Sequence, residues 1–596
     1  MPQTRLDITP RRLAGWALPV GATLTYFLLR LPGLMDMPIF CDESIYLRYA
    51  QLVHGAPLAK AFVSVIDPKP PLHYWLLAAV FGTASDPLLP ARLLSVVAGV
   101  ASLLLLFPLC RELRVLRRPG EDTVRGADTL TAGACLLFLT SPFLAFYQRM
   151  ALAESLVVFE ITLAAWLSLR WAGHSRERAL PELLVKDALP LGLALGAALL
   201  TKQNYSYTLL ALPVVAAIAR AGDAGAHERR KLVLSYLVAL AIALLLFAPY
   251  LLAPAGAGLR DRVFFLGSHG GFGGGLALHA RLCWDNLRYV FVPMVMKNVF
   301  PVQFEGFRPP ADAGWLWIYL TPAVCLLCLA GFASLAWRRE LRLMGFLALW
   351  VTLMLLPFVP FATMAVSRYA LPAVAPMLLA GACLLDTLIR RKDPRPVASG
   401  GWMLARLAAV AALLLWPLRS LALQAADWER QPLTRSDRWQ YASGWPAGLA
   451  SRRAVEALRE LARRRGPLVV ITSTLPGTPN HVAWVYLEGE RNVSLHFVPW
   501  AFQSAILVQP PSEPGGFLLF SGFGDAVVRR EVVRLAPGVP VLFIAEDPYP
   551  AEGGGTATAE SVLAPLNPGL AEVARFANPP MGLPHRPDSV VIYRLR

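Results

Sequence analysis

The residues best suited to chemistry lie in a segment between the first two apolar runs of the chain. An acidic pair, Asp42 and Glu43, opens a stretch whose spacing predicts a short helix. On that helix Asp42, Tyr46 and Tyr49 would share one face, and Glu43 would lie on another. A carboxylate there could act as a general base. Alternatively, Asp42 only caps the helix N-terminus, and local sequence leaves both interpretations open.

A cation follows in the same segment. Lys69 stands between Pro68 and Pro70, and prolines stiffen the chain and disfavour helix in the preceding residue. A short apolar helix is predicted to begin at Pro71. Lys69 would therefore be held at the membrane surface, where it could bind a phosphate group. The alternative is a lysine whose ammonium group reaches the lipid headgroups.

Isolated charges recur at the ends of later apolar runs. Arg149 and Glu154 flank a short turn, Lys202 ends one run, and Arg368 with Tyr369 precedes another. Charges placed there indicate an anionic partner. Arg149 and Glu154 could instead form an ion pair that only stabilises their turn.

Glycine and cysteine motifs give weaker signals. The glycine-rich stretch from His269 to Gly275 lacks a following Lys-Ser or Lys-Thr, which favours a flexible site loop over a nucleotide-phosphate cradle. Cys325 and Cys328 fall inside an apolar run without a second ligand pair, so a zinc or redox site is not favoured. Cys41 and Cys283 fall in loops assigned to the same side, and a disulfide between them stays open.

The elements that must position these residues are membrane-spanning helices. Of 596 residues, 56% are hydrophobic and 16% are charged, whereas soluble domains carry about 25% charged residues. Runs of about 20 apolar residues can cross a bilayer, and in lipid they must be helical. We predict about eleven spans, at 13–34, 88–110, 127–147, 154–172, 188–203, 205–220, 232–252, 313–337, 342–361, 370–389 and 402–423.

Basic residues gather in alternate loops, and this pattern orients the chain. The positive-inside rule places those loops and the N-terminus in the cytoplasm, and an odd span count places the C-terminal part outside. The net charge of +16 is thereby explained without nucleic-acid binding. The first run is too long for a cleavable signal peptide. Two long loops, 35–87 and 253–312, are predicted outside, where long loops commonly carry binding sites.

A second domain is predicted from residue 424 to residue 596, after a transmembrane domain over 1–423. Residues 452–465 read as an amphipathic helix, and strands are predicted at 468–472, 482–487, 493–498, 517–520, 541–544 and 590–594. This is the pattern of a soluble α/β domain. It carries no motif for chemistry, so we expect it to pack on the membrane domain or to handle the acceptor.

In their order along the chain, these motifs resemble the GT-C glycosyltransferases that use polyprenyl-phosphate sugars, such as the protein O-mannosyltransferases and the lipid A aminoarabinose transferases. The resemblance rests on Asp42 and Glu43 with the Tyr46, Arg48 and Tyr49 helix; on Lys69, Pro70, Pro71 and Leu72 with Tyr74 and Trp75; on Arg368 and Tyr369 with Leu371, Pro372 and Pro376; and on Arg149 with Glu154.

The resemblance implies a GT-C-like helical fold and a role for each matching residue. Asp42 matches the essential outer carboxylate and Glu43 its neighbour, so both are catalytic candidates. Lys69, Arg149 and Arg368 are the candidates for binding the donor phosphate. The candidates for lining the substrate cavity are Tyr46, Arg48, His73, Glu154, Lys202, His269 and Tyr369. Pro68 and Glu154 depart from the residues that are common in the family, so sugar specificity does not carry over.

The implied activity moves a monosaccharide from a polyprenyl-phosphate donor to an extracytoplasmic acceptor, with inversion. The acceptor would be a glycolipid, a polysaccharide or a protein. The enzyme would be a multi-pass protein of the bacterial inner membrane, needing no cofactor and no divalent metal. Two hypotheses compete: a transporter or flippase of lipid-linked sugars, which predicts charges along a transmembrane path and internal repeats, and a non-catalytic scaffold for the C-terminal domain.

Overall fold

The computed structural model describes most of the chain. The described residues are 10–63, 69–117, 127–222, 224–253, 275–291, 295–296, 311–312, 314–360, 366–390, 399–473, 477–498, 516–521, 529–534, 538–547, 549–550, 556–558, 560–561, 569–578 and 588–595.

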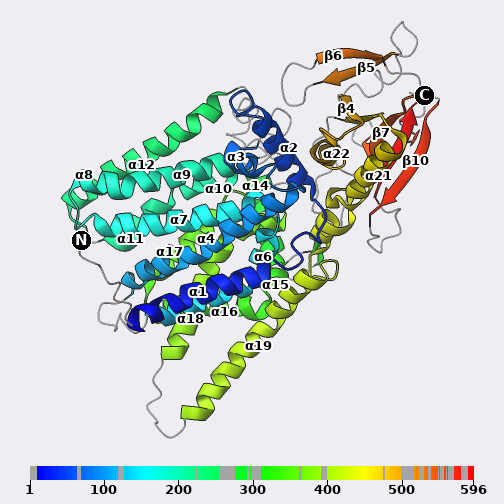
Figure 1. Cartoon of the computed structure of the whole chain (residues 1–596). Helices are drawn as coiled ribbons and strands as arrows, with labels where there is room; N and C mark the ends of the chain where they lie inside the picture. Colours follow the sequence, from blue (N-terminus) through cyan, green and yellow to red (C-terminus); the bar gives the residue numbers. More distant parts are fainter. Residues whose placement is uncertain are drawn as a thin grey trace, which may run out of the picture.

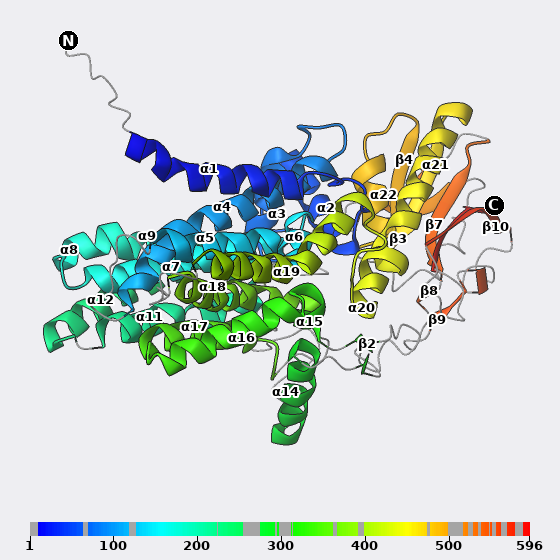
Figure 2. The ribbon, with the colours of Figure 1, turned by 90° about the horizontal axis from the view of Figure 1, so that it is seen from below.

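A bundle of helices forms the N-terminal two thirds (Figures 1 and 2). Every predicted span coincides with one or more helices. The long ones are α1 (Pro10–Arg30), α4 (Leu88–Val115), α7 (Ala153–His174), α9 (Leu189–Thr201), α12 (Ala226–Leu252), α16 (Pro322–Trp337), α17 (Leu341–Leu355), α18 (Val374–Arg390) and α19 (Ser399–Ala426). Shorter pieces are α8 (Leu180–Leu183), η1 (Leu184–Ala188), α10 (Gln203–Leu209), α11 (Leu212–Ala221), α14 (Gly275–Phe291) and α15 (Trp315–Tyr319).

The chain is a multi-pass membrane protein. Within its described residues, six helical segments are long and apolar enough to cross a membrane, or seven if one bent pair counts as a single span. The predicted number of eleven is not confirmed, because several helices in the predicted spans, such as α16 and α17, are shorter than a bilayer-crossing helix.

The bent pair is α5 (Ala127–Thr140) and α6 (Pro142–Gln148), which meet at 62°. Ser141 caps α6 by accepting a hydrogen bond from the Leu144 amide, and Pro142 occupies the first turn of α6. The break turns the chain sideways before α7 begins. It thereby places the turn from Arg149 to Leu152 at the end of the bundle that faces the C-terminal domain (Figure 1).

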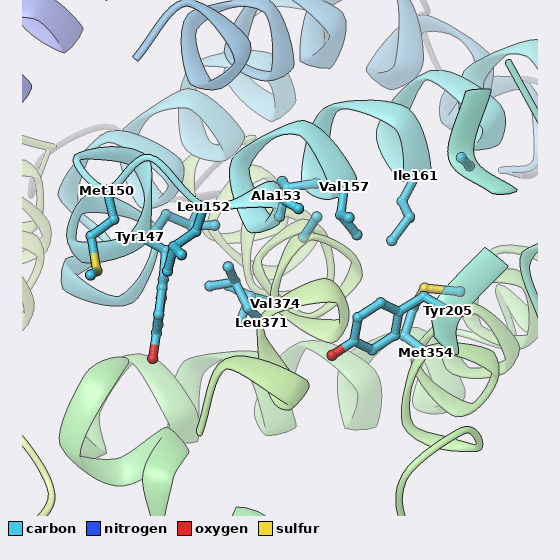
Figure 3. Close-up of a cluster of buried hydrophobic side chains, with 14 of the residues drawn as sticks. Tyr147, Met150, Leu152, Ala153, Val157, Ile161, Tyr205, Met354, Leu371 and Val374 are labelled. Atoms are coloured by element: carbon cyan, nitrogen blue, oxygen red, sulfur yellow. The ribbon is translucent and has the colours of Figure 1, made fainter. Parts of the chain in front are cut away.

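Close helix packing depends on small and well-fitted apolar side chains. A Cβ atom on Gly331 of α16 would lie 2.2 Å from the Ala380 carbonyl oxygen of α18, and one on Gly192 of α9 would lie 2.6 Å from that of Ala239 in α12. Such close approach of backbones is typical of membrane helices. Figure 3 shows the apolar cluster around Val157 and Ile161 of α7, with residues of the neighbouring helices.

Short helices at the same end of the bundle carry the candidate chemistry. They are α2 (Cys41–Gly55), α3 (Pro71–Val80) and the 3-10 helix η5 (Ser367–Ala373); α2 packs against the C-terminal domain, and α3 packs against α2 (Figure 1). The predicted helices after Cys41 and from Pro71 are thus confirmed. No disulfide joins Cys41 of α2 to Cys283 of α14.

The C-terminal part is built on a seven-stranded mixed sheet in the order β10-β11-β7-β3-β4-β5-β6. Its strands are β3 (Leu468–Ser473), β4 (Val493–Val498), β5 (Gly516–Ser521), β6 (Arg529–Arg534), β7 (Val541–Asp547), β10 (Ala571–Ala577) and β11 (Ser589–Leu595). Strand β3 pairs in parallel with β4 and β7, and the other pairs are antiparallel. Helix α21 (Leu449–Arg465), which was predicted, packs on β10 and β11. The domain boundary at 423 stays a prediction.

Short elements complete the fold. They are α20 (Arg435–Arg438), η7 (Trp439–Ser443), η8 (Trp445–Ala447) and the two-residue strands β1 (Val295–Met296), β2 (Ala311–Asp312), β8 (Tyr549–Pro550) and β9 (Thr556–Ala557).

One predicted strand, 482–487, is wrong. The segment belongs to helix α22 (Asn480–Leu487), in which all eight residues are buried. A short, fully buried apolar run lacks the periodicity that separates a strand from a helix. Strands β6 and β10 were not predicted.

Candidate active site

Asp42 lies in the first turn of α2, where two cations from distant parts of the chain meet its carboxylate. Arg368 Nη2, from η5, is 2.8 Å from Oδ2, and Lys69 Nζ, from the segment before α3, is 3.6 Å from Oδ1. The three side chains are only 14–19% exposed. The sequence prediction that Asp42, Lys69 and Arg368 share one site therefore agrees with the geometry.

A second ion pair lies directly against the first. Lys202 Nζ contacts Glu154 Oε1 at 2.5 Å, and Arg368 Nε lies 3.6 Å from the same oxygen, so Arg368 bridges both carboxylates. Lys202 Nζ also lies 5.7 Å above the ring centres of Tyr369 and Tyr205. Tyr205 was not among the sequence candidates. We call Asp42, Lys69, Glu154, Lys202 and Arg368 the charge cluster.

The charge cluster combines three cations with two carboxylates, so its formal charge is positive. Burial raises the pKa of Asp42, but the charges of Lys69, Arg368 and Lys202 outweigh that effect and lower the pKa to about 2. The Asp42 carboxylate is thus ionised at any physiological pH. A partly buried cluster with excess positive charge attracts an anion.

Tyr46 and His73 form the aromatic side of the cluster. Their rings meet edge to face at 4.7 Å, and Lys69 Nζ lies 5.2 Å from the centre of the Tyr46 ring. His73 is buried, and burial lowers its pKa to about 4. His73 is therefore neutral at neutral pH, and it adds shape and hydrogen-bonding capacity to the site but no charge.

Glu43, predicted to be catalytic beside Asp42, has a structural position instead. It is fully buried and pairs with Arg92 of α4 at 2.8 Å, a residue that sequence reasoning missed. Its oxygens also accept the backbone amides of Phe40 and Ala151, at 2.9 and 2.6 Å. Glu43, and not Asp42, therefore satisfies the N-terminus of α2, and it ties that helix to α4 and to the turn before α7.

Arg149 also departs from its predicted role. Its two terminal nitrogens each donate to a backbone carbonyl, those of Pro32 and Gln424, at 2.5 Å. Among the ion pairs of the described residues, none joins Arg149 to Glu154 or to Asp42. The turn between α6 and α7 separates the two charges, so Arg149 points away from the cluster while Glu154 points into it.

Arg48 contacts the C-terminal part and not the cluster. Its Nη1 contacts Glu488 Oε2 at 2.5 Å and donates to Gln51 at 2.8 Å, and its guanidinium lies 4.5 Å from the ring centre of Trp484 in α22. Helix α22 also brings His481 within 6.3 Å of the Tyr49 ring centre. The helix that carries Asp42 is thus clamped to the C-terminal part of the protein. The remaining candidate, His269, lies outside the described residues.

Metal ligands are not clustered in the described part of the chain, where no group of three or more His, Cys, Asp or Glu side chains could hold an ion. Cys325 and Cys328 are buried in α16.

Comparison with known proteins shows which sequences and structures this chain is similar to. The family model described as dolichyl-phosphate-mannose-protein mannosyltransferase matches residues 68–252. An undecaprenyl phosphate-alpha-4-amino-4-deoxy-L-arabinose arabinosyl transferase of Pseudomonas paraeruginosa is 29% identical over 417 residues. That alignment covers 65% of this chain and 63% of the relative, which is somewhat less than two thirds of the relative's length.

Solved structures show the same architecture. ArnT from Cupriavidus metallidurans, in the apo state and bound to undecaprenyl phosphate, matches with a TM-score of 0.51 at 14% and 15% identity, over 97% of this chain and 98% of that protein. The fold is therefore that of the GT-C membrane glycosyltransferases. These matches agree with the resemblance stated from the motifs: the chain is similar to the mannosyltransferase model over residues 68–252 and to the arabinosyl transferase over 417 residues.

Proposed function

We propose that the protein is a membrane glycosyltransferase that moves one monosaccharide from a polyprenyl-phosphate donor to an extracytoplasmic acceptor. The observation that carries this proposal is the charge cluster, in which Asp42 lies 2.8 Å from Arg368 and 3.6 Å from Lys69. A proton acceptor beside several cations is the combination that transfer from a phosphate leaving group requires.

The proposed reaction is a single displacement. An acceptor hydroxyl oxygen attacks the anomeric carbon while the bond from that carbon to the phosphate oxygen breaks, and its electrons stay on the phosphate. Lys69, Lys202 and Arg368 stabilise the charge that develops there. Asp42 takes the hydroxyl proton. Attack from the face opposite the leaving group inverts the anomeric configuration.

The low pKa of Asp42, about 2, makes it a weak base while Lys69 and Arg368 neutralise it. A bound donor phosphate competes for the same two cations. The loss of these ion pairs and the added negative charge of the phosphate raise the pKa of the carboxyl, so donor binding itself converts a paired carboxylate into a stronger base. This ordering prevents proton abstraction before the donor is in place.

The proposed setting follows from the loop charges. With eleven spans, the N-terminus would be cytoplasmic, and the charge cluster and soluble domain would face the outer side of a bacterial inner membrane. The acceptor would be a glycolipid, a polysaccharide or a protein. We also propose that no divalent metal takes part, since Lys69, Lys202 and Arg368 supply the positive charge at the leaving group.

The test uses the full chain in lipid vesicles with a polyprenyl-phosphate sugar identified from the lipid that co-purifies with it. Release of free polyprenyl phosphate, followed by mass spectrometry, is expected only when acceptor is present and should persist in EDTA. A flippase would move the donor across the bilayer with the sugar–phosphate bond intact. Asp427→Asn is the matched control for Asp42→Asn, since the Asp427 carboxylate is 39% exposed and pairs with the exposed Arg430. Movement of intact donor without cleavage would overturn the proposal.

A further inference from the structure

A polar pocket that contains no residue of the charge cluster adjoins the end of α6. It is bounded by the loop after α1, by the end of α6, by the end of α19 and by the segment that follows α19. Its polar lining is Arg149, Gln424 and Gln431, with the ring of Trp428 beside them. We call it the Arg149 pocket.

The guanidinium of Arg149 is the main electrostatic feature of the pocket. Arg149 is only 7% exposed, and no carboxylate in the described part of the chain forms an ion pair with it. Its Nη atoms are used by two backbone carbonyls, but its buried Nε donor has no partner. Burial, followed by the charges of Arg92 and Arg30, lowers the pKa of Arg149 to about 10. The charge of Asp36 acts on Arg149 in the opposite direction, but Asp36 forms no ion pair with it within 4 Å, so the buried guanidinium is only partly compensated.

Two amides leave further hydrogen-bonding groups free in the same pocket. Gln424 is 6% exposed, and its Nε2 donates to the Pro142 carbonyl at 3.0 Å, which leaves Oε1 as the atom without a partner. Gln431 is 1% exposed, and its Nε2 donor also has no partner. A buried polar group without a partner costs free energy, and here two such donors and one acceptor belong to residues that line one cavity.

The wall of the pocket depends on a glycine. Gly33 has a φ of +63°, and a Cβ atom there would lie 2.5 Å from the Ala425 carbonyl oxygen, 2.8 Å from Asp36 Oδ2 and 3.2 Å from Arg149 Nη2. Only glycine therefore lets the loop after α1 close against α19 and Arg149. The enclosed space is about 10 Å³, room for one water-sized group.

We propose that the Arg149 pocket binds an anionic phosphate headgroup from the outer leaflet, at a site separate from the charge cluster. One phosphate oxygen accepts from Arg149 Nε and Gln431 Nε2, and a hydroxyl of the headgroup donates to Gln424 Oε1. The inner end admits a single oxygen, so the rest of the headgroup stays at the mouth, beside Trp428. The turn before α7 links the two sites, because Ala151 in that turn donates to Glu43, the neighbour of Asp42.

The proposal is tested by binding, so it stands or falls independently of the transferase activity. The full-length protein in detergent is titrated with dioleoyl phosphatidic acid, with dioleoyl phosphatidylglycerol and with phosphatidylcholine, and bound lipid is counted by native mass spectrometry. Inorganic phosphate is titrated in a parallel arm. Each anionic lipid should bind more tightly than phosphatidylcholine, and Arg149→Gln should weaken that binding roughly tenfold or more.

Matched variants keep the result interpretable. Arg220→Gln is the control, because Arg220 is also largely buried, pairs with Glu112 and donates to the Glu112 carbonyl, but does not line the pocket. Gln431→Leu removes one free donor and leaves the carbonyl contacts of Arg149 in place. It therefore still tests the proposal if Arg149→Gln fails to fold. Affinity for anionic lipid that is unchanged in Gln431→Leu and in a folded Arg149→Gln would show a site for water only, and would overturn the proposal. If the same variants weaken binding of inorganic phosphate equally, the site recognises free phosphate as well as the lipid headgroup.

Discussion

Replacing Asp42 by asparagine separates the two roles that the geometry gives this residue. Asparagine has nearly the same shape but neither accepts a proton nor carries a charge. If Asp42 is the general base, Asp42→Asn should lower kcat by about 10²- to 10⁴-fold, the usual contribution of a positioned base.

Donor binding should respond in the opposite direction. A phosphate oxygen bound to Lys69 would lie roughly 6 Å from the Asp42 carboxylate, given the 3.6 Å between that carboxylate and Lys69 Nζ and about 2.8 Å for a charge-assisted hydrogen bond. At an effective dielectric constant of about 20, two negative charges at that distance repel by roughly 2–3 kcal/mol. Solvent reaches both groups, so about 1 kcal/mol remains, or about fivefold in affinity.

The assay measures initial release of polyprenyl phosphate at saturating donor, and donor dissociation constants are measured separately by native mass spectrometry. The expected pattern is a large fall in kcat with donor bound as tightly as in the wild type or more tightly. Transfer at the wild-type rate would refute the assignment of the base. Markedly weaker donor binding would refute the competition between carboxylate and phosphate.

Three further outcomes follow from the described contacts. Glu43→Gln leaves the buried Arg92 without a counter-charge. It should destabilise the fold by about 3–5 kcal/mol, measured as a lower thermal midpoint. A variant that is stable but inactive would instead indicate a catalytic role for Glu43. Lys69→Ala removes the largest influence that lowers the pKa of Asp42, so the acid-side loss of kcat/KM should move from below about pH 4 to higher pH, and an unmoved limb would contradict this. Arg48→Met breaks the clamp between α2 and α22. It should speed limited proteolysis of the C-terminal part and leave donor affinity unchanged. Equal proteolysis rates in the variant and the wild type would show that the clamp is dispensable.

Sequence reasoning found the charge cluster because membrane helices penalise charges strongly. Lys202 and Glu154 lie at the ends of apolar runs, and such charges need a partner, which each finds in the other at 2.5 Å. Order along the chain could not show which way a side chain points after a turn. Arg149 and Glu154 are five residues apart, yet only Glu154 joins the charge cluster, because a turn separates α6 from α7.

The pairing of Glu43 with Arg92 could not be read from the sequence either. The two residues are 49 positions apart, and the contact depends on the packing of α2 against α4. Adjacent acids look equivalent in a sequence, whereas the helix directs Asp42 to the cations and Glu43 to the interior. The error at α22 has a similar cause, since burial on all sides removes the periodicity that would have distinguished this helix from a strand.

The excess positive charge of the cluster has a consequence for turnover. A polyprenyl-phosphate sugar is a phosphodiester with one negative charge, whereas the lipid left after transfer is a monoester whose charge approaches −2 at neutral pH. Lys69, Lys202 and Arg368 would therefore hold the spent carrier more firmly than the donor. Escape of that carrier, and not bond cleavage, would then limit the steady-state rate, and added polyprenyl phosphate would act as a competitive inhibitor against the donor.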